Sequence, residues 1–256
     1  LYAIPWNGTA FVASLAFTPS VGTTSITEQH FDFGWETSSG QGIIGYGEGN
    51  NFVYRTYDPV GGFGGTENTI GLGNGVDVLR MCSEPTSDYI GMIFQDAGRD
   101  VNVRVWDGSS LLAGAPSEDS GTEPNGNNNR NVDCAWFNST TALFGFIDNN
   151  ALSIDYFTFD KGNVWSTSAL TTTSNSGNFA ADDIKGMRFV EHPVSQELMV
   201  MTQDILEDVT AIRWSGTAFV SPTTATLEGV TEVTNGAQES VMFDWFRYDT
   251  RPNVTL

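Results

Sequence analysis

The sequence has very little positive charge. Its 256 residues include only two lysines, Lys161 and Lys185, and its formal net charge is −20. A surface that binds the backbone of nucleic acid needs a basic patch, and the scattered arginines provide none. We therefore expect no nucleic-acid partner. The acidity predicts a solvated, self-repelling surface, with binding of a divalent cation or a cationic partner as the alternative.

Long apolar runs and the residues of common catalytic sites are also missing. No stretch reaches the roughly 18 apolar residues of a membrane-spanning helix, so we expect no membrane insertion. His30 and His192 lie far apart and have no cysteine or carboxylate cluster at ligand spacing, which argues against a histidine-based metal site. The Gly-x-Ser-x-Gly motif of a serine nucleophile is absent as well.

The sequence does contain a repeat of roughly fifty residues, the period of a propeller blade or a solenoid unit. Residues 3–12 (AIPWNGTAFV) return almost unchanged at 211–220 (AIRWSGTAFV). Weaker copies occupy residues 54–58, 103–108 and 156–162. The repeat determines the architecture of the chain but not its chemistry.

Each unit divides into four short strands. In the second unit we expect strands at 76–83, 88–95 and 101–107, and a looser strand from Leu111. The alternation of valines with polar residues in 101–107 has the period of two that a half-buried strand requires. Residues 196–210 also fit a helical spacing, but the repeat register predicts strands there. The other first strands are expected at 31–35, 132–137, 184–190 and 241–248, and the second strands centre on 44–46, 144–146 and 198–200.

Four-stranded units of this length predict an all-β, single-domain protein, a five-bladed β-propeller over residues 1–256. Four blades are complete in sequence. The last is built from both chain ends: residues 1–26 supply its third and fourth strands, and 235–256 supply its first strand and part of the second. Aligned on Asp133, Leu256 falls in mid-strand. Either the strand is stunted, or a neighbouring molecule completes it, or the natural chain continues.

Residues 158–165 (TFDKGNVW) resemble the Asp-box of sialidase-type propellers, Ser-x-Asp-x-Gly-x-x-Trp, with Thr158 at the first position and Trp165 at the last. Shortened versions begin at Trp106 and Trp6. The resemblance implies a propeller in which this segment is a structural turn between the third and fourth strands of a blade. The arginine cluster and tyrosine nucleophile of the sialidases cannot be matched here residue by residue.

An aspartate stands at or near the start of every predicted innermost strand. In a propeller these positions converge near one mouth of the central channel. A ring of carboxylates there could hold calcium or a cationic ligand, or supply the acid pair of a glycoside hydrolase. Alternatively, each aspartate accepts backbone N–H bonds, and recurrence in all five units favours that structural role. The five residues are Asp32, Asp77, Asp133, Asp183 and Asp244.

Trp6, Trp106 and Trp214 recur at one repeat position, which predicts packing roles in the core or between blades. Trp35, Trp136 and Trp245 fall close to one another in the first strand, and we expect packing roles for them too.

Several features favour export to the cell surface or the extracellular space. The chain begins at Leu1 without a signal peptide, so we expect it to be processed or trimmed. Cys82 and Cys134 are a candidate disulfide, although an offset of about two residues between their repeat positions argues against pairing. The glycosylation candidates are the three Asn-x-Ser/Thr sequons at Asn7, Asn138 and Asn253.

These observations predict an extracellular, non-catalytic propeller with a structural or adhesive role, possessing no cofactor unless calcium binds. Self-association through the terminal strands would make it a self-assembling surface or filament subunit. The alternative is a carbohydrate-active propeller, either a lectin or a glycosidase, whose glycan site lies at the channel mouth.

Overall fold

The computed structural model describes residues 2–18, 29–118, 131–147, 154–166, 170–171, 184–192, 195–204, 209–220 and 225–228. These residues form four antiparallel sheets, preceded by an N-terminal segment with one short turn of 3-10 helix, η1 (Ala13–Leu15). Within these ranges, no helix has the length and apolar character needed to span a membrane.

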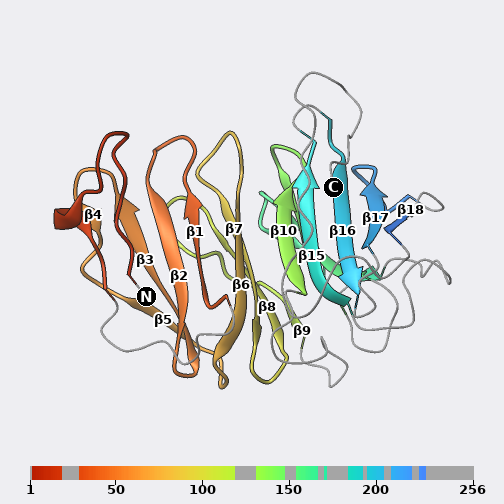
Figure 1. Ribbon diagram of the computed structural model, residues 1–256, viewed down its shortest axis with the longest axis horizontal. Helices are drawn as coiled ribbons and strands as arrows, with labels where there is room; N and C mark the ends of the chain where they lie inside the picture. The colour runs from red at the N-terminus through yellow and green to blue at the C-terminus, as the bar shows by residue number, and fades with distance from the viewer. Residues whose placement is uncertain are drawn as a thin grey trace.

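The four sheets follow one another along the chain, and we call them blades 1 to 4 (Figure 1). Blade 1 contains β1 (Phe31–Trp35), β2 (Gly42–Glu48), β3 (Asn51–Asp58), β4 (Gly62–Phe63) and β5 (Asn68–Gly71). Blade 2 contains β6 (Val76–Ser83), β7 (Ile90–Asp96), β8 (Val101–Trp106) and β9 (Ser117–Glu118). Blade 3 contains β10 (Val132–Trp136), β11 (Thr141–Ile147), β12 (Ile154–Asp160), β13 (Val164–Trp165) and β14 (Leu170–Thr171). Blade 4 contains β15 (Ile184–Glu191), β16 (Leu198–Asp204), β17 (Val209–Trp214) and β18 (Ala225–Glu228).

The predicted strands agree closely with the observed ones. The innermost strands β1 and β6 have the predicted bounds, and β10 and β15 differ from theirs by one residue at one end. The choice of strand over helix for 196–210 is confirmed, because β16 and β17 pair with each other antiparallel there. The fourth strand is looser than the others because in blades 1 and 3 it is split into two short pieces that both pair with the third strand. The predicted strand at 241–248 lies outside the described residues.

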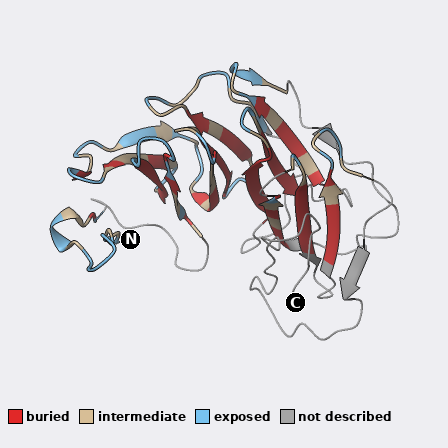
Figure 2. Ribbon diagram, turned by 90° about the horizontal axis from the view of Figure 1, so that it is seen from above, coloured by how far each residue is buried: buried red, intermediate tan, exposed pale blue. Residues whose placement is uncertain are grey.

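The four blades are arranged around a common axis. Their first strands β1, β6, β10 and β15 contact one another in chain order. The apolar cores lie between successive blades, so that buried side chains fill the middle of the strands (Figure 2). One core, for example, joins Val103 of β8 to Phe144 of β11 and Phe157 of β12. Successive sheets therefore cover each other's facing sides, which is the radial packing of a β-propeller.

Glycines in the second strands allow the blades to approach closely. Gly45 faces Met81 of the next blade, and Gly145 faces Phe189 of the next. A Cβ atom at position 145 would lie only 2.2 Å from Phe189 Cζ, so only glycine fits while that ring keeps its place. The glycine-rich character of these strands thus serves packing between sheets rather than turns alone.

The N-terminal segment repeats the outer part of a blade. Isolated antiparallel bridges join Ala3 to Phe17 and Trp6 to Phe11, and the second bridge has counterparts in blades 2 and 4. The segment lies beside blade 1, where the Phe17 ring contacts Tyr46 and the Arg55 guanidinium. This arrangement is what a third and a fourth strand of a further blade would adopt.

We expect Gly145→Ala to destabilise the fold by about 1–3 kcal/mol, because the added methyl group overpacks the contact with Phe189. Gly186→Ala in β15 is the matched control, since no atom lies within 4 Å of the place that its added methyl group would take. Urea unfolding of both variants measures the difference. Equal midpoints would contradict the close-approach role of Gly145.

Candidate functional site

An alternating set of charged side chains occupies one level of the innermost strands. The last residues of these strands pair at the start of the second strands, as Trp35 does with Gly42 and Trp136 with Ala142, and this fixes a common register. The position three residues earlier holds Asp32, Arg80, Asp133 and Arg188 in blades 1 to 4.

Both aspartates of this set bond to backbone N–H groups. Asp32 accepts the N–H of Phe33 through Oδ1 (2.9 Å) and that of Met81 in the next blade through Oδ2 (2.8 Å). Asp133 repeats the pattern with Cys134 and with Phe189 of blade 4, at 3.0 and 2.8 Å. Each carboxylate therefore fastens its own innermost strand to the following one.

Burial dominates the protonation of these two groups. Loss of hydration raises the pKa of both Asp32 and Asp133 above the ordinary value of 3.8, although the bonded N–H groups and the nearby Arg80 and Arg188 act in the opposite direction. The Arg188 guanidinium lies 3.8 Å from Asp133 Oδ2. The bonds to backbone N–H groups are those that the structural role requires, and a calcium or acid-pair role for these aspartates stays a prediction.

The other three predicted aspartates do not join this set in the described structure. Asp77 lies at an irregularity in the pairing of β6 with β7, and Arg80 takes the axial position in that blade. Asp183 and Asp244 fall outside the described residues. In the part of the chain that the structure describes, no group of three or more histidine, cysteine or acidic side chains could hold a metal ion.

Cys82 and Cys134 form a disulfide between the innermost strands of blades 2 and 3, with Cα atoms 5.8 Å apart. The sequence offset that argued against pairing is accommodated by the stagger of these strands. Cys82 occupies the register position of Gly34, and Cys134 occupies that of Phe33, one residue earlier. An offset of one residue is what brings the two sulfur atoms together across the blade boundary.

The predicted turn residues cap their own loops. In the Asp-box-like segment between β12 and β13, Asp160 Oδ1 accepts the Gly162 N–H (3.0 Å), and Trp165 packs on Phe159 with ring centroids 4.6 Å apart. Asp107 Oδ1 does the same in blade 2, for the N–H groups of two serines. The segment is thus a turn between the third and fourth strands, as the resemblance implied.

Two sequons also lie in tight turns. Asn7 Oδ1 accepts N–H bonds from Thr9 and Ala10, and Asn138 Oδ1 accepts them from Thr140 and Thr141. In both sequons the threonine hydroxyl also donates to the asparagine Oδ1. Glycosylation of these two asparagines stays a prediction, and Asn253 lies outside the described residues.

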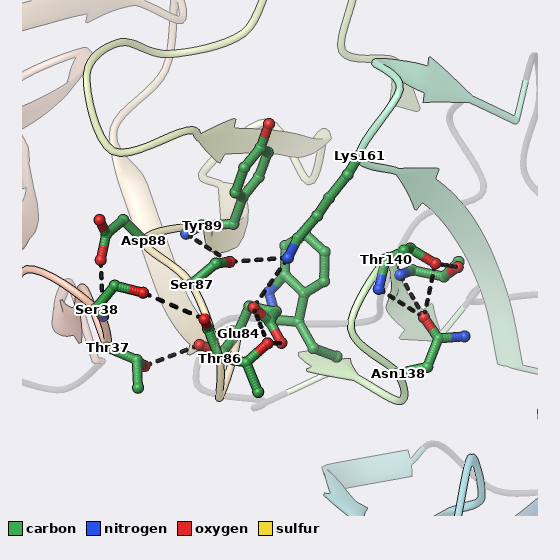
Figure 3. Close-up of polar contacts among 12 residues, drawn as sticks. Thr37, Ser38, Glu84, Thr86, Ser87, Asp88, Tyr89, Asn138, Thr140 and Lys161 are labelled. Atoms are coloured by element: carbon green, nitrogen blue, oxygen red, sulfur yellow. Dashed lines mark hydrogen bonds and ion pairs between the residues drawn. The ribbon is translucent and has the colours of Figure 1, made fainter.

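A polar cluster that no sequence pattern predicted lies at the boundary of blades 2 and 3 (Figure 3). Lys161 Nζ donates to Glu84 Oε2 at 2.9 Å and to Ser87 Oγ at 2.8 Å. The same ammonium group lies 5.0 Å from the centroid of the Tyr89 ring and 5.6 Å from that of Trp136. We call Glu84, Ser87, Tyr89, Trp136 and Lys161 the lysine cluster.

Glu84 is the buried anchor of the lysine cluster. Burial alone would raise its pKa, but hydrogen bonds from Ser87, Lys161 and Thr86 outweigh that effect and lower it, so the carboxylate is ionised at neutral pH. No sequence motif indicates this pair, because Glu84 and Lys161 are 77 residues apart. Only the packing of blade 3 on blade 2 brings them together.

Hydroxyl groups of the neighbouring loops surround the lysine cluster (Figure 3). Thr37 Oγ1 donates to the Glu84 carbonyl (2.8 Å), and Ser38 Oγ donates to that of Thr86 (3.2 Å). Asp88 Oδ1 accepts the N–H groups of Ser38 and Ser39, both at 2.8 Å. Carboxylates, hydroxyl groups, an ammonium group and aromatic rings thus meet on one side of the propeller.

A second feature is a cavity of about 540 Å³ between the N-terminal segment and blade 1. Its walls are mainly aromatic and aliphatic, and Asp32 is its one acidic residue. The residues that line it are Tyr2, Ala3, Ile4, Pro5, Trp6, Phe31, Asp32, Phe33, Trp35, Ile44, Tyr57 and Phe63.

Comparison with known proteins identifies the fold. No family model and no curated protein sequence matches this chain. Among solved structures, the BP39L lectin from Burkholderia pseudomallei matches with a TM-score of 0.55 and 9% identity, over 84% of this chain and 61% of the lectin. A mutant of the Aleuria aurantia lectin in complex with alpha-methyl-L-fucoside matches with a TM-score of 0.52 and 12% identity, over 91% and 71% of the two chains.

These similarities establish an all-β fold of the propeller class. This chain spans about two thirds of the length of the two lectins. The Aleuria aurantia lectin is six-bladed, so the matches establish the class of fold and not the number of blades. The NanB sialidase of Streptococcus pneumoniae is a weaker match, with a TM-score of 0.46 and 10% identity over 67% of this chain and 27% of the sialidase.

The axial and turn aspartates should respond to pH in opposite directions. The pKa of Asp133 is higher in the folded protein than in the unfolded chain, where it is near 3.8. The contribution of Asp133 to the stability of the fold is therefore fully present below this unfolded pKa and is lost as the pH rises through the folded pKa. The N–H groups of Gly61 and Val60 lower the pKa of Asp58, so its contribution is present above that value and is lost as the pH falls through the folded pKa.

We therefore expect the stability deficit of Asp133→Asn to grow as the pH is lowered from about 7 to about 4, and that of Asp58→Asn to shrink. Thermal unfolding of the two variants and the unsubstituted protein across this range measures both trends. Parallel trends in the two variants would contradict the assignment of Asp133 as a carboxylate controlled by burial.

Proposed function

We propose that this protein is a carbohydrate-binding β-propeller whose glycan site is the lysine cluster between blades 2 and 3. The observation that carries the proposal is the convergence, at one blade boundary, of a charge-neutralised ammonium group, a buried carboxylate, hydroxyl groups and two aromatic rings. Recognition of a sugar needs donors and acceptors for its hydroxyl groups, and an apolar surface for its C–H face.

The chemistry of the cluster favours a neutral sugar. The Lys161 charge is matched by Glu84 at 2.9 Å, and the whole chain carries a net charge of −20. An acidic sugar would therefore approach a negative surface with no uncompensated cation to receive it at this cluster. Tyr89 is half-buried and can offer its ring to the C–H face of a sugar, while Ser87 and Lys161 can share hydrogen bonds with the sugar hydroxyls.

The fold neighbours support the carbohydrate-binding alternative over a structural or filament-forming role. Two of them are named as lectins, and one is bound to a fucoside. The site proposed here lies at a blade boundary rather than at the channel mouth, because the axial carboxylates Asp32 and Asp133 already bond to backbone N–H groups. The role of a propeller is decided by its sites and not by its fold.

An extracellular or cell-surface location belongs to the same proposal. The Cys82–Cys134 disulfide supports it, because such bonds form and persist in oxidising compartments. The sequons at Asn7 and Asn138 lie in turns at the protein surface, where a glycan could be attached.

Binding should be sensitive to the lysine cluster. On an array of neutral glycans, followed by calorimetry with the best ligand, we expect Tyr89→Ala to weaken binding at least about tenfold through loss of the aromatic surface. The double variant Glu84→Gln/Lys161→Met should do the same, and it removes both charges together so that no buried charge is left unpaired.

The matched control is Glu197→Gln/Arg213→Met, which removes an ion pair of the same length, 2.9 Å, in blade 4. Circular dichroism checks that each variant is folded. If a glycan binds with equal affinity to all three variants, the lysine cluster is not its site. If no glycan binds the folded protein, the proposed function fails.

A further inference from the structure

The first strand of blade 1 exposes apolar side chains that its counterparts bury. Phe31 is 49% exposed, whereas Val132, at the same register position in blade 3, is fully buried. Trp35 is 53% exposed, whereas its counterpart Trp136 is 2% exposed. In blade 3 these side chains are covered by the preceding blade, for example by Tyr89 against Trp136. Blade 1 has no described sheet on that side.

The N-terminal segment shows the same contrast. Trp6 is 56% exposed, whereas Trp106 and Trp214, which make the same type of bridge in blades 2 and 4, are 6% and 2% exposed. In those blades the tryptophan stands at the end of a third strand that is paired with a second strand. The prediction that all these tryptophans pack in the interior thus holds for Trp106, Trp136 and Trp214, and the structure leaves Trp6 and Trp35 uncovered.

The cavity of about 540 Å³ lies between these two exposed surfaces. On one side are residues of the N-terminal segment such as Tyr2 and Trp6, and on the other is β1 (Figure 2 shows the segment beside blade 1). In the other blades, the third strand is separated from the first strand of the next blade. The space between them is filled by the first and second strands of the blade to which the third strand belongs.

We propose that this cavity is the seat of residues 241–248 of the same chain, which would enter it as the innermost strand of a fifth blade. The proposal is independent of glycan binding. The segment VMFDWFRY carries Phe243-Asp244-Trp245, which repeats the order of Phe31-Asp32-Phe33 in β1. Its aromatic side chains match the aromatic walls of the cavity, and burial of such rings is strongly favourable in water.

The axial charges favour the same occupant. In this register Asp244 takes the level of Asp32, Arg80, Asp133 and Arg188. It would then stand between blade 4 and blade 1, next to Arg188 in the ring order. A carboxylate there has Arg188 on one side and Asp32 on the other. It can pair with the Arg188 guanidinium, and it can bond to the backbone of a neighbouring first strand as Asp32 and Asp133 do.

A second copy of this chain could fill the cavity with the same segment, as strand complementation would require. The segment of the same chain is favoured, because a short covalent connection gives it an effective concentration in the range of about millimolar. The same interface between successive blades then recurs around the whole axis and leaves no exposed edge.

The native disulfide provides the test. Cys82 of blade 2 has the register position that Gly34 has in blade 1. Cys134, in the following blade 3, has the register position of Phe33. In the proposed fifth blade Phe246 takes the Gly34 position, so Phe246 and Phe33 should be as close as the native pair. We expect Phe33→Cys/Phe246→Cys to form a second disulfide within one chain, seen by mass spectrometry of a non-reduced digest, with a monomer on a non-reducing gel.

A milder variant keeps the proposal testable if that double variant does not fold. The thiol of Phe31→Cys should react with a maleimide about a hundredfold more slowly than a denatured control, because labelling needs the segment to open. Adding Trp245→Asp should restore fast labelling, and Phe11→Cys, at the 69% exposed Phe11, should react fast in either background.

Protection of Phe31→Cys that is independent of protein concentration supports the proposal. Fast labelling of Phe31→Cys in the folded protein overturns it. Protection that appears only at high protein concentration, or a disulfide between two chains in the double variant, also overturns it and assigns the cavity to a second copy.

Discussion

The structure depends on one constraint, which is that the sheets of successive blades must cover each other's apolar faces. The second strands are buried almost throughout, and the apolar cores lie between blades rather than within them. A single blade of this kind has no independent core and gains its stability only from its neighbours. Gly45 and Gly145 allow the close approach, because a side chain at either position would collide with the next blade.

Polar groups lock the same interfaces that the apolar side chains fill. Asp32 and Asp133 reach across to the backbone of the next first strand, and the Cys82–Cys134 disulfide joins two first strands covalently. Each of these contacts spans about one repeat in sequence, so none can form until two blades have come together. The buried carboxylates carry a desolvation cost, and the N–H bonds offset it.

The proposed glycan site lies at the same boundary, where the strands end in loops. There the loops are exposed and rich in hydroxyl groups, and the ion pair of Lys161 with Glu84 holds the turn of blade 3 against blade 2 (Figure 3). The rigid sheets thus position chemically diverse loops, which is how propellers and other β scaffolds acquire binding functions. The cavity between the N-terminal segment and blade 1 is different. Its walls are aromatic and have few polar groups, so that it resembles an unfilled interface between blades.

The sequence by itself determined the repeat, the bounds of the strands and the class of fold. These properties are local or periodic: alternation of apolar residues predicts strands, and Asp160 or Asn138 predicts a capped turn from its immediate neighbours. The register of one blade against the next could not be read in the same way. It depends on a bulge near Asp77 and on the stagger between first strands, which a count along the chain does not reveal. For that reason only the tertiary structure decided that Arg80 rather than Asp77 stands at the axial level, that Cys82 meets Cys134, and that Lys161 meets Glu84.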